Sequence, residues 1–397
     1  MRKLRVGVWL NSNMIPGVGG GYGYYSELVK AMSKYSFKDA EIIFLSNKLV
    51  KDDTFKSRII KSKPQKLIIL KILLKIIIRL HPLFKSLRKI IEKIINKSKH
   101  EIYQYADIIY YLTPDCVYPD SPYIYTLWDL GHFNCYAFPE LSMNGIFEIR
   151  KKHHDFIPHK ALMVFTESET GKKQCEKYLN INKDRIEVVP VFPSGVVDQK
   201  CIAVKPAKMK KGDCFIHYPA QFWAHKNHYN LLVAMLSVIE TFSQIKLVLT
   251  GADKGNKKYI LETIVELELE KNVIDLGFVS LEELRWLYEN SHGLVMPTLL
   301  GPTNMPVIEA AELNCPVACT NLSGHIEQLG DYGYYFNGID PNDIAKHILL
   351  MINDKKSGII KRYDSKFNMN NAMEAIDESF SKLKQIIFCW GKNDRIS

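Results

Sequence analysis

The sequence lacks the patterns of a zinc site, a disulfide framework and a membrane-spanning helix. Its eight cysteines include no CxxC pair and follow no regular spacing. That distribution argues against structural zinc and paired disulfides, and it favours a reducing compartment. No uninterrupted apolar run reaches the about 18 residues that a spanning helix needs. The opening stretch MRKLRVGVWLNSN has a short apolar run interrupted by Asn, so we expect a first strand there and no signal peptide.

The basic residues are concentrated in one segment. The formal net charge is +10, yet residues 51–100 alone carry most of the excess, with fifteen Lys and Arg against three acids. A nucleic-acid-binding protein is expected to spread its basic residues over a broad face, so we expect no nucleic-acid partner. The remaining composition, 47% hydrophobic and 24% charged, is that of a globular chain, and 397 residues suffice for two domains.

Within that segment, KLIILKILLKIIIRL (66–80) places four basic residues at spacings of five, four and four, on one helical stripe. A second stretch, 83–97, separates an Ile/Leu face from a Lys/Arg face. One interpretation is two core helices with solvated basic faces. The other, which we favour, is a pair of basic amphipathic helices over about 56–98, lying on an anionic membrane surface through 60–98.

Short β-branched or aromatic runs alternate with helical patterns, which predicts parallel, doubly wound α/β sheets. The predicted strands are 4–10, 41–45, 107–112, 123–127, 162–166, 186–191, 214–219, 246–250, 273–276, 294–297 and 317–320, with helices such as 23–35, 143–158 and 169–179 between them. A Pro-containing piece, 193–212, interrupts the rhythm. We therefore expect two Rossmann-like domains, 1–195 and 196–370, and a last helix within 371–397 that returns to the first domain.

Three strand-to-helix junctions contain residues suited to an anionic ligand. The first, PGVGGGYGYYSEL (16–28), has Gly19, Gly20 and Gly21, which let the backbone approach a bulky anion at a helix N-terminus. No acid closes the second strand, so the pattern is not that of a dinucleotide-binding fingerprint. A plain flexible turn explains this stretch about equally well.

The second junction is HYPAQFWAHKNHYNLLVAM (217–235). Lys226 falls where a helix begins, so its charge and the helix dipole would act together on a diphosphate. The alternative is a solvated lysine flanked by surface residues His225 and His228. Those two histidines share a helical spacing, but no third metal ligand is nearby, so we expect no metal here.

The third junction is LGPTNMPVIEA (300–310). Pro306 suits a first helical turn, and the N–H groups of Asn304, Met305 and Val307 are expected to be unpaired at the carboxyl end of a strand, where doubly wound sheets bind ligands. Glu309, one turn further, can reach both hydroxyls of a ribose. An ordinary amphipathic helix with an exposed Glu is the alternative.

Together these junctions resemble retaining glycosyltransferases of family 4, which have the GT-B fold. Lys226 matches the family lysine of the donor pyrophosphate site, and Glu309 matches the second glutamate of the Glu-x7-Glu motif. KLVLTG (246–251), VIDLGF (273–278), LEEL (281–284), CPVACT (315–320) and Gly324–Glu327 follow in the family order. In the first half the likeness rests on the glycine loop, TLWDLGHF (126–133) with Phe138-Pro139-Glu140, and VFTESETGKKQ (164–174).

The sequence departs from the family at three places. Gly301 stands where the motif has its first glutamate, and Gln221 stands where the family has an arginine. Trp128-Asp129 replaces a His-Asp pair, with a histidine only at His132. The resemblance therefore leaves Thr303 and Asn304 as the nearest polar side chains to read the sugar.

The resemblance implies transfer of a sugar from a nucleotide diphosphate-sugar, with retention, to a glycan or lipid-linked acceptor in surface polysaccharide biosynthesis, for example of lipopolysaccharide. The expected catalytic residues are Lys226, His132 and Asp129. Donor-binding residues would be Gly19–Gly21, Gln221, Lys226, Thr303–Met305 and Glu309. No metal or other cofactor is expected, and the location would be cytoplasmic, peripheral at the inner face of the membrane. Alternatives are a sugar-nucleotide epimerase of the same fold and an inactive GT-B binding protein.

Overall fold

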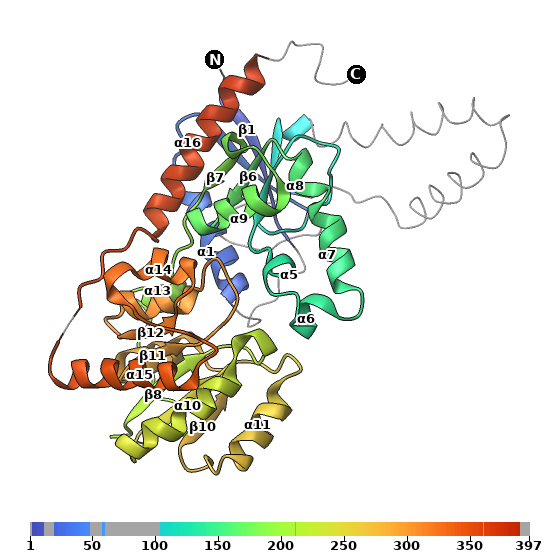
Figure 1. Ribbon diagram of the computed structural model, residues 1–397. Helices are drawn as coiled ribbons and strands as arrows, with labels where there is room; N and C mark the ends of the chain where they lie inside the picture. Colours follow the sequence, from blue (N-terminus) through green and yellow to red (C-terminus); the bar gives the residue numbers. More distant parts are fainter. Residues whose placement is uncertain are drawn as a thin grey trace.

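The computed structural model describes residues 2–11, 20–47, 58–59, 104–210, 212–359 and 361–389. These residues form two α/β domains, one above the other in Figure 1, and each is built on a parallel sheet. The α/β class and the doubly wound architecture predicted from the sequence are confirmed.

The N-terminal sheet has the strand order β3-β2-β1-β4-β5-β6-β7. Its strands are β1 Leu4–Trp9, β2 Ala40–Ser46, β3 Arg58–Ile59, β4 Ile108–Tyr111, β5 Tyr123–Leu127, β6 Met163–Thr166 and β7 Ile186–Val188. The helices around it are α1 Gly20–Lys34, α5 Gly131–Asn134, α6 Pro139–Ser142, α7 Ile146–His154, α8 Ile157–Lys160 and α9 Glu169–Leu179. Every residue of β4 and β5 is buried, because helices cover both faces of a parallel sheet.

The C-terminal sheet has the order β10-β9-β8-β11-β12-β13. Its strands are β8 Phe215–Pro219, β9 Lys246–Thr250, β10 Val273–Gly277, β11 Leu294–Met296, β12 Val317–Thr320 and β13 Tyr334–Phe336. Its helices are α10 His228–Thr241, α11 Lys257–Glu266, α12 Leu281–Asn290, α13 Met305–Glu312, α14 Ser323–Leu329 and α15 Pro341–Lys356. Short 3₁₀ turns lie at Lys183–Arg185, Gly195–Val197, Ala224–Lys226 and Gly330–Tyr332.

The strand order reverses between β1 and β4 in the first sheet and between β8 and β11 in the second. Ligands of open α/β sheets bind beyond the carboxyl ends of the strands at such switch points. The loops that follow β8 and β11 contain Lys226 and the stretch Gly301–Asn304, so the fold brings two of the predicted junctions to one edge.

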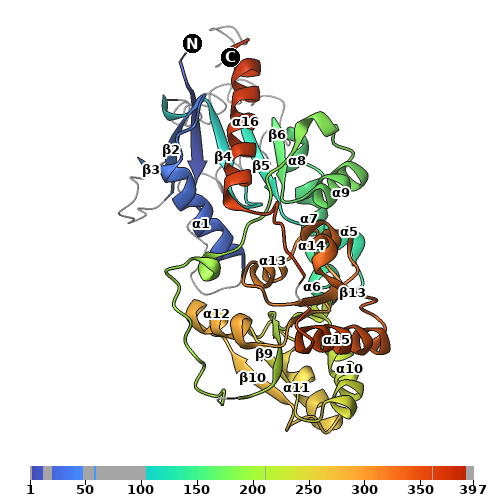
Figure 2. The same cartoon turned by 90° about the vertical axis from the view of Figure 1, so that its left-hand side faces the viewer.

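The last helix, α16 (Met369–Phe388), returns to the N-terminal domain and lies along its sheet (Figures 1 and 2). Phe380 packs on Phe37 with ring centroids 5.3 Å apart, and Lys384 pairs with Asp39 over 2.6 Å. The predicted crossing of this helix is therefore confirmed.

One predicted helix needs correction, and the Lys226 junction can be described in more detail. The single helix expected over 143–158 is two helices, α7 and α8, because Pro158 cannot donate to the preceding turn and its ring disfavours a continuous helix. Lys226 lies in a 3₁₀ turn just before α10, with Asn227 at φ 59° between them. His228 is not a surface residue: it is 1% exposed and stacks on Phe222.

Candidate functional site

The loop after β11, in the C-terminal domain, forms hydrogen bonds with the N-terminal domain. Thr303 Oγ1 donates to Glu167 Oε2 over 2.6 Å, and Ser168 Oγ donates to the Pro302 carbonyl over 3.3 Å. Glu167 and Ser168 directly follow β6, so the carboxyl-end loops of both sheets meet here. This meeting point is the candidate site.

Lys226 is held by a chain of hydrogen bonds from the C-terminal domain. Its Nζ donates to Asn304 Oδ1 over 3.1 Å, and Asn304 Nδ2 lies 3.0 Å from His325 Nε2. His325 Nδ1 lies 2.7 Å from the Thr320 carbonyl, which only a protonated Nδ1 can bond, so His325 Nε2 accepts from Asn304. Burial lowers the pKa of Lys226 to about 8, and the Asp129 charge opposes that shift.

Asn304 is more constrained than the sequence suggested. Its backbone N–H, expected to be unpaired, donates to Gln328 Oε1 over 2.9 Å, so that expectation is wrong. No hydrogen-bond partner for the Met305 N–H is recorded within the described part of the chain, so this donor remains for a ligand. The side chains of Thr303 and Asn304 both hydrogen-bond to other protein groups. Either side chain would have to bind a sugar hydroxyl in addition to its protein partner.

Glu309 is 3% exposed, which excludes the alternative of an exposed helical Glu. Its Oε1 accepts from the Ser194 hydroxyl over 2.5 Å and from the Ser194 N–H over 3.2 Å, and its Oε2 accepts from the Tyr288 hydroxyl over 2.9 Å. Burial raises the pKa of Glu309, and these bonds oppose that rise. Ser194 thus presents a hydroxyl to the carboxylate that we predicted for ribose.

Asp129 joins the site from the loop after β5. Its Oδ1 accepts from Arg150 over 2.5 Å and from the Gly131 N–H over 2.8 Å. The Asp129 charge raises the pKa of both Lys226 and Glu167, which indicates that it lies near both groups. The prediction that it contacts a bound sugar stays a prediction.

His132 is fully buried and its ring packs on Phe133 and His154. Its Nδ1 accepts from Arg150 Nε over 3.3 Å, while its Nε2 has no partner among the residues that the structure describes. Burial lowers the pKa of His132 to about 4, so the imidazole is neutral at pH 7.

Two predicted donor-binding elements contribute less defined contacts. Gly19 lies outside the described residues, and Gly20 begins α1. A Cβ on Gly21 would come within 3.3 Å of the Trp128 ring, so α1 begins close to the Trp128-Asp129 loop. Gln221 accepts from the Trp223 indole N–H over 3.1 Å, at the carboxyl end of β8.

Further contacts hold the domains together around the site. The Glu327 carboxylate of α14 accepts from the N–H groups of Glu169 and Thr170 at 2.7 and 2.8 Å, which caps the N-terminus of α9. On the other side, Glu140 Oε1 lies 2.6 Å from His225 Nδ1 and also accepts the His225 N–H.

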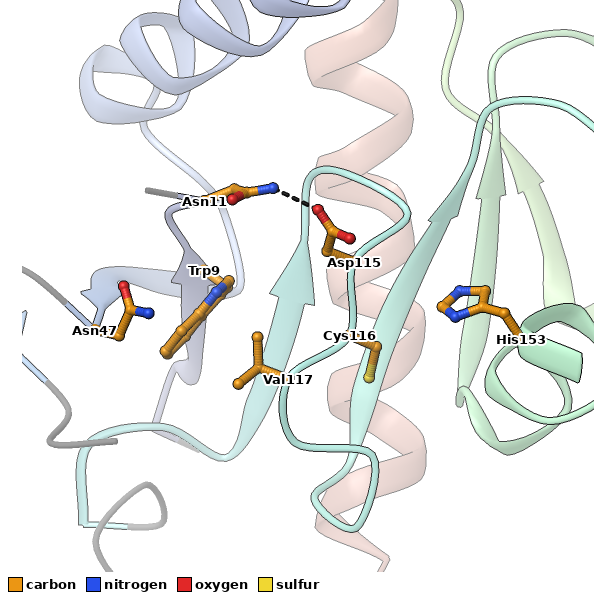
Figure 3. A pocket seen from close by; sticks show the side chains of 7 residues that line it. All are labelled: Trp9, Asn11, Asn47, Asp115, Cys116, Val117 and His153. Atoms are coloured by element: carbon orange, nitrogen blue, oxygen red, sulfur yellow. Dashed lines mark hydrogen bonds between the residues drawn. The ribbon is translucent and has the colours of Figure 1, made fainter. Parts of the chain in front are cut away.

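A cavity of about 260 Å³ lies in the N-terminal domain at the β1/β4 switch point (Figure 3). Asn11, two residues after β1, donates to Asp115 over 2.6 Å, as the dashed line shows. His153 of α7 lies on the opposite side of the cavity and contacts the Tyr125 hydroxyl over 3.0 Å. The remaining lining residues are Trp9, Asn47, Cys116 and Val117.

Sequence reasoning did not find Glu167, Ser194, Tyr288 or His325. Each of these residues contacts a residue from a different element, so no short sequence motif contains both members of a contacting pair. The membrane prediction falls on 60–98, outside the described residues. Among the residues that are described, no helix is long and apolar enough to cross a membrane, and no group of three ligand-type side chains could hold a metal ion.

Comparison with known proteins supports the assignment of the second half of the chain to a glycosyltransferase domain. Residues 203–367 match the family model described as glycosyl transferases group 1. An O-antigen chain mannosyltransferase B of Escherichia coli is 26% identical over 241 residues, which cover 58% of this chain and 61% of that protein. The chain thus matches about three fifths of the length of this relative.

Solved structures share the whole fold. Sucrose-phosphate synthase from Thermosynechococcus elongatus has a TM-score of 0.63 at 16% identity, covering 98% of this chain and 100% of that one. Anabaena HepE, solved with UDP-glucose, has a TM-score of 0.57 at 15% identity, covering 97% and 98%. Residues 203–367 therefore match a group 1 glycosyl transferase domain, within a chain whose overall fold is that of GT-B glycosyltransferases.

Proposed function

We propose that this protein is a retaining glycosyltransferase. It transfers a sugar from a nucleotide diphosphate-sugar to a glycan or lipid-linked acceptor, in the synthesis of a surface polysaccharide such as lipopolysaccharide. The observation that carries the proposal is the half-buried Lys226 ammonium, held at the carboxyl edge of β8 and β11 by Asn304. The family match over 203–367, a range that includes Lys226, and the O-antigen relative support a glycosyltransferase activity.

The donor would lie mainly on the C-terminal domain. Lys226, the Met305 N–H and the first turn of α1 would contact the diphosphate, since a lysine and helix N-termini both favour phosphate. Glu309 would accept the ribose hydroxyls in place of Ser194, which now occupies Oε1. The UDP-glucose in the HepE structure supports a nucleotide-sugar as the ligand class.

Retention would follow from front-face displacement. The bond from the anomeric carbon to the donor phosphate breaks, and the acceptor oxygen bonds to that carbon on the same face. The acceptor proton passes to the departing phosphate oxygen. Lys226 stabilises the charge that develops on this phosphate in a cleft shielded from water. Asp129, with its Oδ1 held by Arg150 and Gly131, would contact the sugar near the reacting carbon, and the buried His132 would support that loop.

The acceptor would bind the N-terminal domain. Its polar cavity at the β1/β4 switch point offers the Asn11 and Asp115 side chains to acceptor hydroxyls. The basic segment 60–98 would hold the enzyme on the cytoplasmic face of an anionic membrane, where a lipid-linked acceptor is found. Neither metal nor another cofactor takes part in this proposal.

The proposal is tested with a panel of nucleotide-sugars, including UDP-glucose and GDP-mannose. A true donor at 100 times its Kd should stabilise the protein by about 2.7 kcal/mol. With that donor, Lys226→Ala should lower turnover roughly 100-fold or more, while Lys258→Ala, a change at a solvent-exposed lysine of the same domain, should leave it unchanged.

Unchanged turnover in Lys226→Ala would contradict the site. Isomerised nucleotide-sugar formed without any acceptor would instead identify an epimerase. For the membrane part, co-sedimentation with liposomes should require anionic lipid, and equal recovery with neutral liposomes would contradict the electrostatic attachment.

A further inference from the structure

The family resemblance implies an acid at position 301, but this chain has Gly301, and the backbone here does not readily accept a side chain. Its φ is +129°, a conformation that L-residues rarely adopt. A Cβ at this position would lie 2.9 Å from the Thr303 carbonyl oxygen and 3.0 Å from Asn304 Nδ2. The loop is therefore built without a side chain at 301.

Glu167 brings a carboxylate to the same loop from the opposite domain. It follows β6 at the carboxyl edge of the N-terminal sheet, and its Oε2 accepts from Thr303, two residues beyond Gly301. Its Oε1 has no hydrogen-bond partner within the described part of the chain, and the side chain is only partly buried. One oxygen is thus fixed and the other is available.

The titratable and polar groups that act on Glu167 come from four different parts of the chain. Asp129 follows β5, Tyr24 belongs to α1, Tyr110 belongs to β4, and Thr303 precedes α13. The cations of the site include Lys226, bound to the residue after Thr303, and Arg150, bound to Asp129. Burial raises the pKa of Glu167 to about 7, the Thr303 bond lowers it, and the Asp129 charge raises it.

We infer that Glu167 binds hydroxyl groups of the donor sugar through Oε1, from the N-terminal domain, in place of the acid absent at Gly301. The inference rests on the proposed function and specifies its substrate class. A carboxylate accepts hydrogen bonds from sugar hydroxyls, and a neighbouring Asp129 disfavours a second anion. The donor sugar is therefore a neutral, hydroxyl-bearing sugar, and donors carrying a uronic acid are rejected.

The test compares the wild-type protein with Glu167→Gln, which keeps the shape and removes the charge. Glu169→Gln, at an exposed glutamate two residues further, is the matched control. With the donor found in the screen, Glu167→Gln should lower kcat/KM roughly 10- to 100-fold, the size expected for losing a hydrogen bond to a charged group. Binding of the free nucleoside diphosphate should change less than about twofold, because that ligand lacks the sugar.

Donors lacking single hydroxyl groups identify the contact. For one of them, the wild-type protein should discriminate against the deoxy donor, whereas Glu167→Gln should not, because the two changes remove the same hydrogen bond. Thr303→Val provides a second route if Glu167→Gln does not fold. In wild type the kcat/KM should rise with pH through the neutral range in which Glu167 ionises, and Thr303→Val should move that rise to higher pH.

The outcomes separate the two claims. Wild-type protein that turns over a donor while Glu167→Gln matches Glu169→Gln overturns the inference alone. An equal loss of free nucleoside diphosphate binding in Glu167→Gln, with no change in the pH profile of Thr303→Val, also overturns it and leaves a structural role. Wild-type protein that turns over no nucleotide-sugar at all overturns the proposed function, and the inference with it.

Discussion

Lys226 and Asn304 follow two neighbouring strands, β8 and β11, and the Lys226 ammonium donates to Asn304 Oδ1 over 3.1 Å. Asn304 owes its orientation to His325, whose Nε2 accepts its amide and whose Nδ1 bonds the Thr320 carbonyl. A half-buried lysine with one well-oriented acceptor still has N–H donors for a phosphate. In the proposed site, His325 would therefore be a positioning residue that acts on the ligand through Asn304 and Lys226.

Replacing His325 tests this chain of bonds. His325→Phe should weaken nucleoside diphosphate binding about 5- to 10-fold, measured by calorimetry, because a buried hydrogen-bond partner of Asn304 is lost. His325→Gln should recover most of the affinity, since its amide can donate to Thr320 and accept from Asn304. His347→Phe, on α15, is the control and should bind normally. Equal losses in the Phe and Gln variants would contradict the orienting role.

The lowered pKa of Lys226 predicts that ligand binding depends on pH. The ammonium is charged below a pKa of about 8 and neutral above it, so diphosphate affinity should fall as pH rises from 8 to 9.5. The decline should approach tenfold per pH unit, the limit for one linked proton. Lys226→Arg, which stays charged throughout, should show no such decline, and the same decline in that variant would assign the titration to another group.

The lowered pKa of Lys226 also predicts that the stability of the fold rises with pH, whereas the ligand affinity falls. The folded-state pKa lies below the ordinary 10.5, so the charged form opposes folding fully below pH 8, and the penalty disappears by about pH 10.5. Lys226→Met should therefore raise the melting temperature by a few degrees, roughly, at pH 7 and by less at pH 10. A gain that does not shrink with pH would contradict this origin.

Much of the fold could be predicted from the sequence because buried parallel strands have long apolar runs. β5, β9 and β12 match their predicted bounds at every residue. β3 and β13 were missed, because two or three residues are too few to show a periodicity. The break between α7 and α8 followed from Pro158, which the helical pattern around it obscured.

Residues of the candidate site could be proposed from the sequence only where a single strand-to-helix junction contains them. Lys226 and Glu309 each carry a local signal, namely a strand end followed by a helix start. Glu167 gave none, because its importance arises from Thr303, which is 136 residues away in sequence. The same holds for Ser194, which lies in the connection between the domains and contacts Glu309, 115 residues away in sequence.

Ser194 and Tyr288 should stabilise the fold through a shared partner. Each donates to a different oxygen of the buried Glu309, so Ser194→Ala and Tyr288→Phe should each lower the free energy of unfolding by about 1–3 kcal/mol in urea titrations. The double variant should lose less or more than the sum of the singles, because both change the same carboxylate. Strict additivity would contradict the coupling.

Gly301 provides the last prediction, since its backbone conformation and its crowding can be tested separately. Gly301→Ala places a Cβ at φ +129° and within 3.0 Å of two loop atoms, so the loop must shift. We expect a loss of about 1–3 kcal/mol in unfolding free energy and weaker nucleoside diphosphate binding, because the displaced Asn304 also orients Lys226. Gly255→Ala, at φ +101° with no atom within 4 Å, shares the strain without the crowding. It should lower stability but bind the nucleoside diphosphate normally. Normal binding by Gly301→Ala would mean that the loop adapts and that an acid at 301 is not excluded by shape.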